Sequence, residues 1–215
     1  MKKYELTEET VTVYGKTLYR IRAVRDFGSV KTGEFGGYIE KEENLSHFGN
    51  AWVSGNAWVF DNARVYDNAW VFGDAKVYGD AWVFGNAWVF GDAKVYGDAW
   101  VFGNAGVFGN AKVYDDAWVC GDAKVYGDAW VSGNAEVFNT MHFFVQGPIG
   151  SRNGFITFYR TKDDTVEVRC GCFSGSLQEF VNQVEETHGG SRYEKEYKLA
   201  AELAKVCIRL EGESR

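Results

Sequence analysis

The side chains best suited to catalysis are few, and they lie outside the repetitive middle of the chain. The sequence has three histidines, His47, His142 and His188, and none falls within residues 52–138. A general base that works near neutral pH, or a zinc site built from imidazoles, would need a histidine there. We therefore expect no catalytic residue, no cofactor and no enzyme activity.

The cysteines offer one possible metal site. Cys170 and Cys172 are separated by one residue, so on a strand both thiols would project from the same side. Cys207 or His188 could complete a zinc site around this pair. A C-x-C pair is, however, a weaker metal signal than two C-x-x-C knuckles, and reduced cysteines packed in a small core are the favoured alternative. We expect no bound metal.

The turn-rich segment at residues 147–154, GPIGSRNG, is the best candidate for binding a small anion. Its glycines could form a backbone nest, with Arg152 as the clamp. The segment lacks the Lys-[Ser/Thr] ending of a P-loop and so does not predict a nucleotide hydrolase. The alternative is an ordinary turn at the start of a domain. The candidate ligand-binding residues are Gly150, Ser151, Arg152, Thr157, Tyr159 and Arg160.

A repeat that fills the middle of the chain must position these candidates. Residues 73–90 read GDAKVYGDAWVFGNAWVF, and residues 91–108 repeat them with one change, Gly106 at the position of Trp88. The unit (G/D)-(N/D)-A-x-V-(F/Y) continues with small deviations over residues 49–138. A six-residue period of this kind indicates a parallel β-helix.

Each hexad predicts one short strand and one corner. Alternation along A-x-V-(F/Y) turns alanine and valine inward and turns x and Phe/Tyr outward. The Gly-Asn or Gly-Asp pair tolerates the left-handed backbone of a tight corner, and aspartate replaces glycine at Asp61, Asp67 and Asp115. Fifteen hexads, three to a coil, give five triangular coils. At roughly 4.8 Å per layer, the stack would be about 24 Å tall.

Valine followed four residues later by alanine, as in Val53 and Ala57, recurs through the repeat. In this pattern the chain resembles the hexapeptide-repeat proteins, which implies a left-handed β-helix and, as is common in that family, a trimer. The chain departs from the family after valine, where Phe or Tyr stands in place of a small or acidic residue. The family's acyltransferases use a histidine base, and its γ-type carbonic anhydrases bind zinc through three histidines. The histidine positions of this chain therefore disfavour both activities.

Counting by eighteen residues places the outward side chains in columns. Two faces carry tryptophan columns, and a third carries Lys76, Lys94 and Lys112 between Trp58 and Trp130 and is expected to face water. One aromatic column per face can be explained by cross-strand stabilisation, about 0.2–1 kcal/mol per pair. Two aromatic columns side by side form a larger apolar patch than soluble monomers usually expose. We therefore predict self-association, with a trimer favoured, through Trp52, Trp70, Trp88, Trp82, Trp100, Trp118, Phe84 and Phe102.

The flanking segments predict two smaller parts of a mainly β protein. Residues 1–48 are expected to form an N-terminal β cap with a hairpin turn at 14–16, residues 49–140 the β-helix, and residues 141–215 a small α+β domain. Ile39 and Leu45 are in phase with the repeat, so the first coil is expected to begin near residue 38. In the last part we expect, in order, a linker (139–147), a hairpin (155–161 and 166–173), two helices (176–188 and 193–205) and a final strand (206–210).

Composition restricts the partners and the location. Residues 49–138 hold five basic against eleven acidic side chains, and the whole chain has a net charge of −7, which disfavours nucleic-acid binding. No apolar run reaches membrane-spanning length, and the N-terminal residues lack the apolar centre of a signal peptide. Four cysteines form no disulfide framework in a chain of this size, so we expect a cytoplasmic protein without a membrane partner.

The N-terminal segment (1–48) resembles the leaders of uncharacterised bacterial and phage hexapeptide-repeat proteins, and the C-terminal segment (141–215) resembles C-terminal modules of phage and prophage proteins of unknown function. These resemblances imply a phage-encoded protein in the host cytoplasm. We expect a non-enzymatic binding or assembly protein whose self-associating β-helix displays the C-terminal domain. It would inhibit a host protein or sequester a nucleotide signal. One alternative is carbohydrate binding by the tryptophan columns. The other is an acyltransferase-like or zinc-hydrolytic enzyme with a site between subunits, built on His47 or His142.

Overall fold

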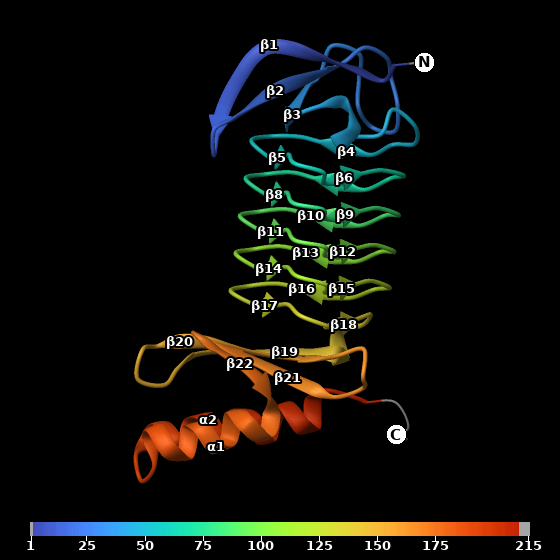
Figure 1. Ribbon diagram of the computed structural model, residues 1–215. Helices are drawn as coiled ribbons and strands as arrows, with labels where there is room; N and C mark the ends of the chain where they lie inside the picture. Colours follow the sequence, from blue (N-terminus) through green and yellow to red (C-terminus); the bar gives the residue numbers. More distant parts are fainter. Residues whose placement is uncertain (1, 211–215) are drawn as a thin grey trace.

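Three parts lie in line along one long axis in the computed structural model, which describes residues 2–210 (Figure 1). A β cap at the N-terminal end is followed by a parallel β-solenoid of about six turns. A small domain of four strands and two helices completes the chain. The fold is therefore mainly β, as the hexads predict.

Fifteen two-residue strands form the walls of the solenoid, and strands three apart in the chain pair in parallel, so that three flat faces run along the axis. The lysine face contains β5 (Trp58–Val59), β8 (Lys76–Val77), β11 (Lys94–Val95), β14 (Lys112–Val113) and β17 (Trp130–Val131). The notched face, named for its glycine, contains β4 (Trp52–Val53), β7 (Trp70–Val71), β10 (Trp88–Val89), β13 (Gly106–Val107) and β16 (Lys124–Val125). The tryptophan face contains β6 (Arg64–Val65), β9 (Trp82–Val83), β12 (Trp100–Val101), β15 (Trp118–Val119) and β18 (Glu136–Val137).

Residues eighteen apart lie opposite one another on each face, which confirms the predicted columns. Trp100, for example, pairs with Trp82 on one side and with Trp118 on the other. The phenylalanine and tyrosine positions form stacked ladders beside these columns, and the Phe84 and Phe102 rings are 4.9 Å apart and nearly parallel. Offset stacking of this kind stabilises the pile of coils along its axis.

The interior and the corners of the solenoid also follow the prediction. The alanine and valine of every hexad from Ala51 to Val137 are buried. Glycine corners have positive φ, and Asp61, Asp67 and Asp115 adopt φ of 60°, 58° and 56° where glycine is missing. Small inward side chains thus allow each coil to be narrow, and the left-handed corners allow it to turn.

The solenoid begins before the first complete hexad. In β3 (Phe35–Ile39), Tyr38 and Ile39 pair with Trp58 and Val59, and Leu45 forms a parallel bridge with Val65. A short 3₁₀ helix, η1 (Glu42–Asn44), makes the corner between them. The predicted start near residue 38 is therefore confirmed, and part of the first turn is built from residues that precede residue 49.

The N-terminal cap covers the open end of the solenoid. Strands β1 (Tyr4–Val13) and β2 (Lys16–Ala23) form the predicted hairpin, with Tyr14 and Gly15 in left-handed conformation. The cap encloses Trp52, whose ring meets those of Tyr4 and Phe27 edge-on and whose exposed fraction is 0%. Trp52 was predicted to face outward, but the cap makes it part of the core.

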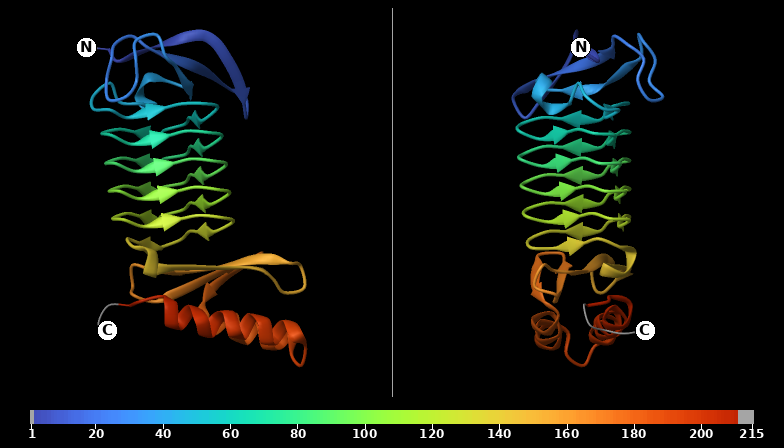
Figure 2. Two further views of the ribbon diagram at one scale, coloured as in Figure 1. Left: turned by 180° about the vertical axis from the view of Figure 1, so that it is seen from behind. Right: turned by 90° about the vertical axis from the view of Figure 1, so that its right-hand side faces the viewer.

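The C-terminal domain places a sheet between the solenoid and two helices (Figure 2). Tyr159 and Phe143 on one face of the sheet belong to the solenoid core, whereas Ile156 and Phe158 pack with the helices. The antiparallel sheet and the helices comprise β19 (Phe143–Ile149), β20 (Gly154–Arg160), β21 (Val166–Cys170), β22 (Phe173–Ser176), α1 (Leu177–His188) and α2 (Arg192–Cys207).

Two local predictions in this domain were wrong. The expected linker at residues 139–147 is a 3₁₀ turn, η2 (Thr140–His142), followed by strand β19, because residues from Phe143 onward pair with β20. The expected strand at residues 206–210 does not form, because Val206 and Cys207 continue α2. The helix start at Ser176 is confirmed, since Ser176 and Glu179 exchange the two hydrogen bonds of a capping box.

Candidate functional site

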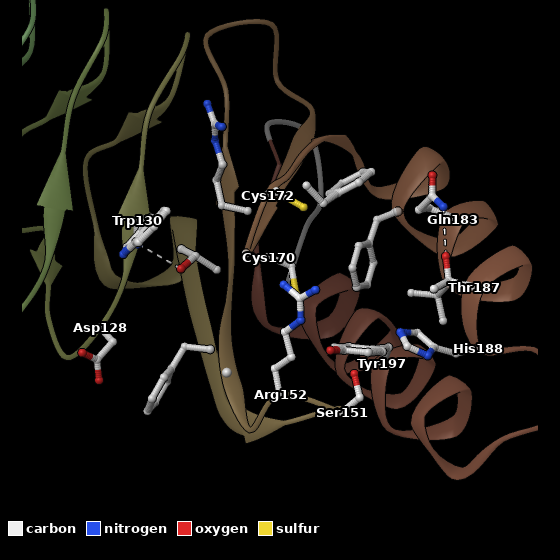
Figure 3. A pocket seen from close by; sticks show the side chains of 18 of the residues that line it. Asp128, Trp130, Ser151, Arg152, Cys170, Cys172, Gln183, Thr187, His188 and Tyr197 are labelled. Carbon is white, nitrogen blue, oxygen red and sulfur yellow. Dashed lines mark hydrogen bonds between the residues drawn. The ribbon is translucent and has the colours of Figure 1, made fainter.

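A pocket of about 950 Å³ lies where the lysine face meets the C-terminal domain (Figure 3). The last coils form one wall, the loops at one end of the sheet form the second, and helices α1 and α2 form the third. The polar and ionisable residues that line it include Lys112, Asp128, Ser151, Arg152, Arg169, Cys170, Cys172, Gln183, His188 and Tyr197. Aromatic side chains from all three walls complete the lining: Trp130, Phe155, Phe173 and Phe180.

The pocket walls are fixed to each other by hydrogen bonds between β20, the following loop and the last coil. The Trp130 backbone N–H donates to the Thr157 hydroxyl over 3.0 Å, and this hydrogen bond is the dashed line at Trp130 in Figure 3. The Lys162 backbone N–H donates to the Asn134 carbonyl over 2.9 Å. Because these contacts join the end of the solenoid to the sheet directly, the pocket does not depend on a flexible linker.

Arg152 is one of the cations that line the pocket. It is exposed on the turn between β19 and β20, and in Figure 3 its side chain extends toward Cys170, with Tyr197 and His188 on the helix side. Within residues 2–210 its guanidinium forms no ion pair. An exposed guanidinium in a partly apolar pocket is suited to a carboxylate or phosphate, because it offers a planar fork of donors.

The backbone nest expected in this turn is already occupied by a side chain of the protein. The Gly150 N–H donates to the Glu196 carboxylate over 2.8 Å. Gly150 has a φ of 71°, and a Cβ at this position would collide with the Tyr197 hydroxyl. The glycine therefore lets the turn pack closely on α2, and Arg152 rather than the Gly150 N–H is left for a ligand.

The six predicted ligand-binding residues are divided between two places. Ser151, Arg152 and Thr157 line the pocket. Tyr159 is buried against the solenoid, where its hydroxyl lies 3.4 Å from that of Ser132, and burial raises its pKa. Arg160 lies at the junction of the two parts and is described next.

Arg160 is held inside the junction between the solenoid and the sheet. Its side chain is only 3% exposed, and it donates to the carboxylates of Glu136 over 2.9 Å and Asp164 over 2.7 Å. The guanidinium also lies 4.9 Å from the centre of the Phe138 ring. Arg160 thus joins the last coil to the C-terminal domain and is removed from the pocket.

Four residues of the pocket were not predicted from the sequence to lie at a ligand site: Lys112, Trp130, Arg169 and Tyr197. The Lys112 ammonium lies 4.1 Å from the Trp130 ring, and Arg169 lies 3.9 Å from Asp115. The repeat pattern predicts that Lys112 and Trp130 are the last members of the lysine face. It contains no signal that the sheet of the C-terminal domain packs beside them. Their pairing leaves a basic and aromatic wall opposite Arg152.

The Cys170 thiol and the Tyr197 phenol stay protonated near neutral pH. Burial raises the pKa of Cys170. Burial, and next the neighbouring Cys170, raise the pKa of Tyr197, while Arg152 acts in the opposite direction. These groups can therefore donate hydrogen bonds to a ligand but are not activated as nucleophiles.

The remaining histidines are engaged within the chain. His47 stacks on Tyr4 with ring centres 4.3 Å apart and accepts from the Lys3 backbone N–H through Nδ1. His142 is buried, its ring meets that of Phe138 edge-on, and burial lowers its pKa. Neither ring projects from an outer face of the coils, where an enzyme site between subunits would need it.

The tryptophan columns differ in how much aromatic surface they offer. On the tryptophan face, Trp82, Trp100 and Trp118 stack in parallel with centres 5.4 Å apart, so each ring partly covers the next. On the notched face Trp88 is 53% exposed. Sugar rings stack on open aromatic faces, so the tryptophan face, with its rings stacked on each other, does not favour the carbohydrate-binding alternative.

A second hollow, of about 610 Å³, runs along the lysine face toward the pocket. Lys76, Lys94 and Lys112 line it together with asparagine and aspartate corners, and Lys112 borders both hollows. Lys76 lies 4.2 Å from the Trp58 ring, as Lys112 does near Trp130. The lysine face therefore carries a polar groove, lined by three lysines and two aspartates, that runs to the pocket.

Within residues 2–210, no group of three or more His, Cys, Asp or Glu side chains is placed to hold a metal ion. Cys170 and Cys172 both line the pocket, whereas Cys207 lies at the end of α2. No helix in the same range is long and apolar enough to cross a membrane.

Comparison with protein-family models found no matching family, and comparison with curated proteins found no matching relative. The function must therefore be argued from the geometry of the chain itself.

Proposed function

We propose that the protein is a non-enzymatic binding protein for a small ligand that carries an anionic group and an aromatic ring. The observation that supports this proposal is the pocket itself, which brings Arg152 and Lys112 together with Trp130 and Phe155. A concave site with apolar walls and a few charged groups is the usual form of a small-molecule site. A mononucleotide, with one phosphate and one base, is a ligand type that combines both features.

The electrostatics favour a single anionic group placed near Arg152. Lys112 is already in contact with the Trp130 ring, and Arg169 is close to Asp115. Asp128 at the rim would repel a second anionic group on that side. A phosphate at Arg152 would leave the aromatic part of the ligand facing Trp130 and Phe155.

The hexapeptide-repeat assignment is part of the proposal and is supported by the chain's own hexads. A phage-encoded protein that sequesters a nucleotide signal, or that uses the domain beside this pocket to inhibit a host protein, would fit such a site. A rigid solenoid joined to the sheet by direct hydrogen bonds would keep the pocket open in the absence of ligand.

Isothermal titration with three probes tests the proposal: adenosine monophosphate, adenosine and inorganic phosphate. We expect the nucleotide to bind more tightly than either of its parts. Arg152→Gln should weaken nucleotide binding by about 10–150-fold, because a hydrogen bond to a charged group contributes roughly 1.5–3 kcal/mol. Arg192→Gln, which removes an exposed arginine outside the pocket lining, is the matched control and should bind as the unaltered protein does.

Two results would refute the proposal. One is the absence of binding at millimolar concentration for both adenine and guanine mononucleotides. The other is an equal loss of affinity in Arg152→Gln and Arg192→Gln, which would show a general charge effect.

A further inference from the structure

Of the pocket-lining residues in the range 2–210, Asp128 is the one carboxylate, and the other charged side chains are cations. Ala129, between Asp128 and Trp130, is buried in the solenoid, so alternation brings the Asp128 and Trp130 side chains to the same outer surface. In Figure 3 these two residues lie on the coil side of the pocket, whereas Arg152 lies nearer the helices. A hydrogen-bond acceptor therefore lies beside an aromatic ring, away from the guanidinium.

The contacts of Asp128 within the chain leave most of its accepting capacity free. The Asn110 side-chain amide donates to Asp128 Oδ1 over 2.9 Å. The Lys112 ammonium lies over the Trp130 ring instead, and no cation in the described part of the chain forms an ion pair with Asp128. A carboxylate has about four lone-pair positions for hydrogen bonds, so Oδ2 and part of Oδ1 are available to donors on a ligand.

The coil itself does not require a carboxylate at position 128. The corner column that ends at Asp128 contains both asparagine and aspartate: Asn56, Asp74, Asp92 and Asn110. In another corner column the same hydrogen bond joins asparagine to asparagine, from Asn50 to Asn68 over 3.0 Å and from Asn86 to Asn104 over 3.2 Å. Asparagine at position 128 would therefore preserve the contact with Asn110, and the negative charge of Asp128 indicates a role beyond the coil.

The nucleobases differ in what they offer to a carboxylate. Guanine presents two adjacent donors, N1–H and the 2-amino group, and these match the two oxygens of a carboxylate. Adenine and cytosine place a ring-nitrogen lone pair beside their amino group, and uracil has a single N–H between two carbonyl oxygens. The lone pairs of these three bases would repel the carboxylate, so a carboxylate on the wall of a base site favours guanine.

We propose that the ligand of this pocket is a guanine mononucleotide and that Asp128 is the residue that selects the base. This inference rests on the proposed function, the binding of a mononucleotide. The base stacks on Trp130, its N1–H and 2-amino group donate to Asp128, and its O6 accepts from Lys112, which lines the same wall. Because Asn110 already holds the carboxylate in the free protein, little ordering is needed when the base binds.

Isothermal titration of the full chain with the monophosphates of guanosine, inosine and adenosine tests the inference. Inosine monophosphate lacks only the 2-amino group, and we expect it to bind about 10-fold more weakly than guanosine monophosphate, because one hydrogen bond to a charged acceptor is lost. Adenosine monophosphate should bind about 100-fold more weakly than guanosine monophosphate, because its ring-nitrogen lone pair would face the Asp128 carboxylate.

Asp128→Asn separates base selection from a structural role. The variant should bind guanosine monophosphate about 10-fold more weakly and adenosine monophosphate more tightly than the wild type does, because an asparagine amide can donate to a ring nitrogen of adenine and accept from its amino group. Asp74→Asn is the matched control, since Asn56 donates to Asp74 over 3.2 Å in the same corner column and Asp74 is outside the pocket lining. It should bind all three nucleotides as the wild type does, and melting curves check that both variants are folded.

Equal affinity of the wild type for guanosine and adenosine monophosphates would overturn this inference and leave the mononucleotide site in place. So would an Asp128→Asn variant that keeps the wild-type preference, or one that loses affinity for all three nucleotides equally. Binding of none of the three would overturn both proposals.

Discussion

Replacing Arg160 with glutamine should destabilise the protein strongly without weakening its ligand site. The substitution leaves the carboxylates of Glu136 and Asp164 without their cationic partner in a junction where the arginine is 3% exposed. Removing one partner of a buried ion pair costs about 3–5 kcal/mol. Since the two carboxylates are 26% and 31% exposed and can regain some water, we expect a loss near the lower end, about 3 kcal/mol.

Urea unfolding followed by tryptophan fluorescence measures this loss. For a chain of this size, about 3 kcal/mol corresponds to a decrease in melting temperature of roughly 6–12 °C. A double-mutant cycle of Arg160→Gln with Glu136→Gln then isolates the ion pair, because Glu136→Gln should cost less when Arg160 is already absent. Arg192→Gln serves as the control and should change the free energy of unfolding by less than about 0.5 kcal/mol.

The same variant distinguishes the structural role of Arg160 from the ligand-binding role that the sequence suggests. Well below its melting temperature, Arg160→Gln should bind the nucleotide probe as the wild type does, because its guanidinium does not line the pocket. A variant with unchanged stability and lost binding would refute this reasoning and restore Arg160 as an anion clamp.

Two further predictions concern the cap and the corners. Lys3 is fully buried, and burial, with a smaller effect of Arg25, lowers its pKa from 10.5 to about 8. Between these two pH values the unfolded state therefore binds more protons than the folded state, so the free energy of unfolding should rise with pH. After allowance for solvent screening, we expect a rise of about 2 kcal/mol between pH 8 and pH 10.5. Lys3→Met should remove this rise when the free energy of unfolding is measured by urea titration at several pH values. If the variant showed the same dependence on pH as the wild type, the prediction would be wrong. Gly91→Ala should cost about 1–3 kcal/mol, because φ is 71° and a Cβ would lie 3.1 Å from the Gly109 nitrogen. Gly127→Ala, with a similar φ of 66° and open space around its Cβ, should cost less, and equal melting temperatures would show that crowding between coils is unimportant.

The sequence predicts the solenoid because the information for it is local and repeated. Alternation decides that Val95 points inward, and the eighteen-residue period decides that it pairs with Val77 and Val113. Corners without glycine keep the same backbone conformation: Asp67 stands in place of a corner glycine and adopts a φ of 58°. Each of these properties depends on residues within the repeat itself.

The ends of the solenoid and the pocket could not be predicted in this way, because they depend on contacts between distant segments. Trp52 lies in the hexad GNAWVS, which differs from that of the exposed Trp88 only in its last residue, and the packing of Tyr4 and Phe27 buries it. Arg160 lies one strand position from Tyr159, and only the position of Glu136 shows that it forms an internal ion pair. Arg152 and its turn are therefore predictable from the sequence, whereas the wall that faces them is not.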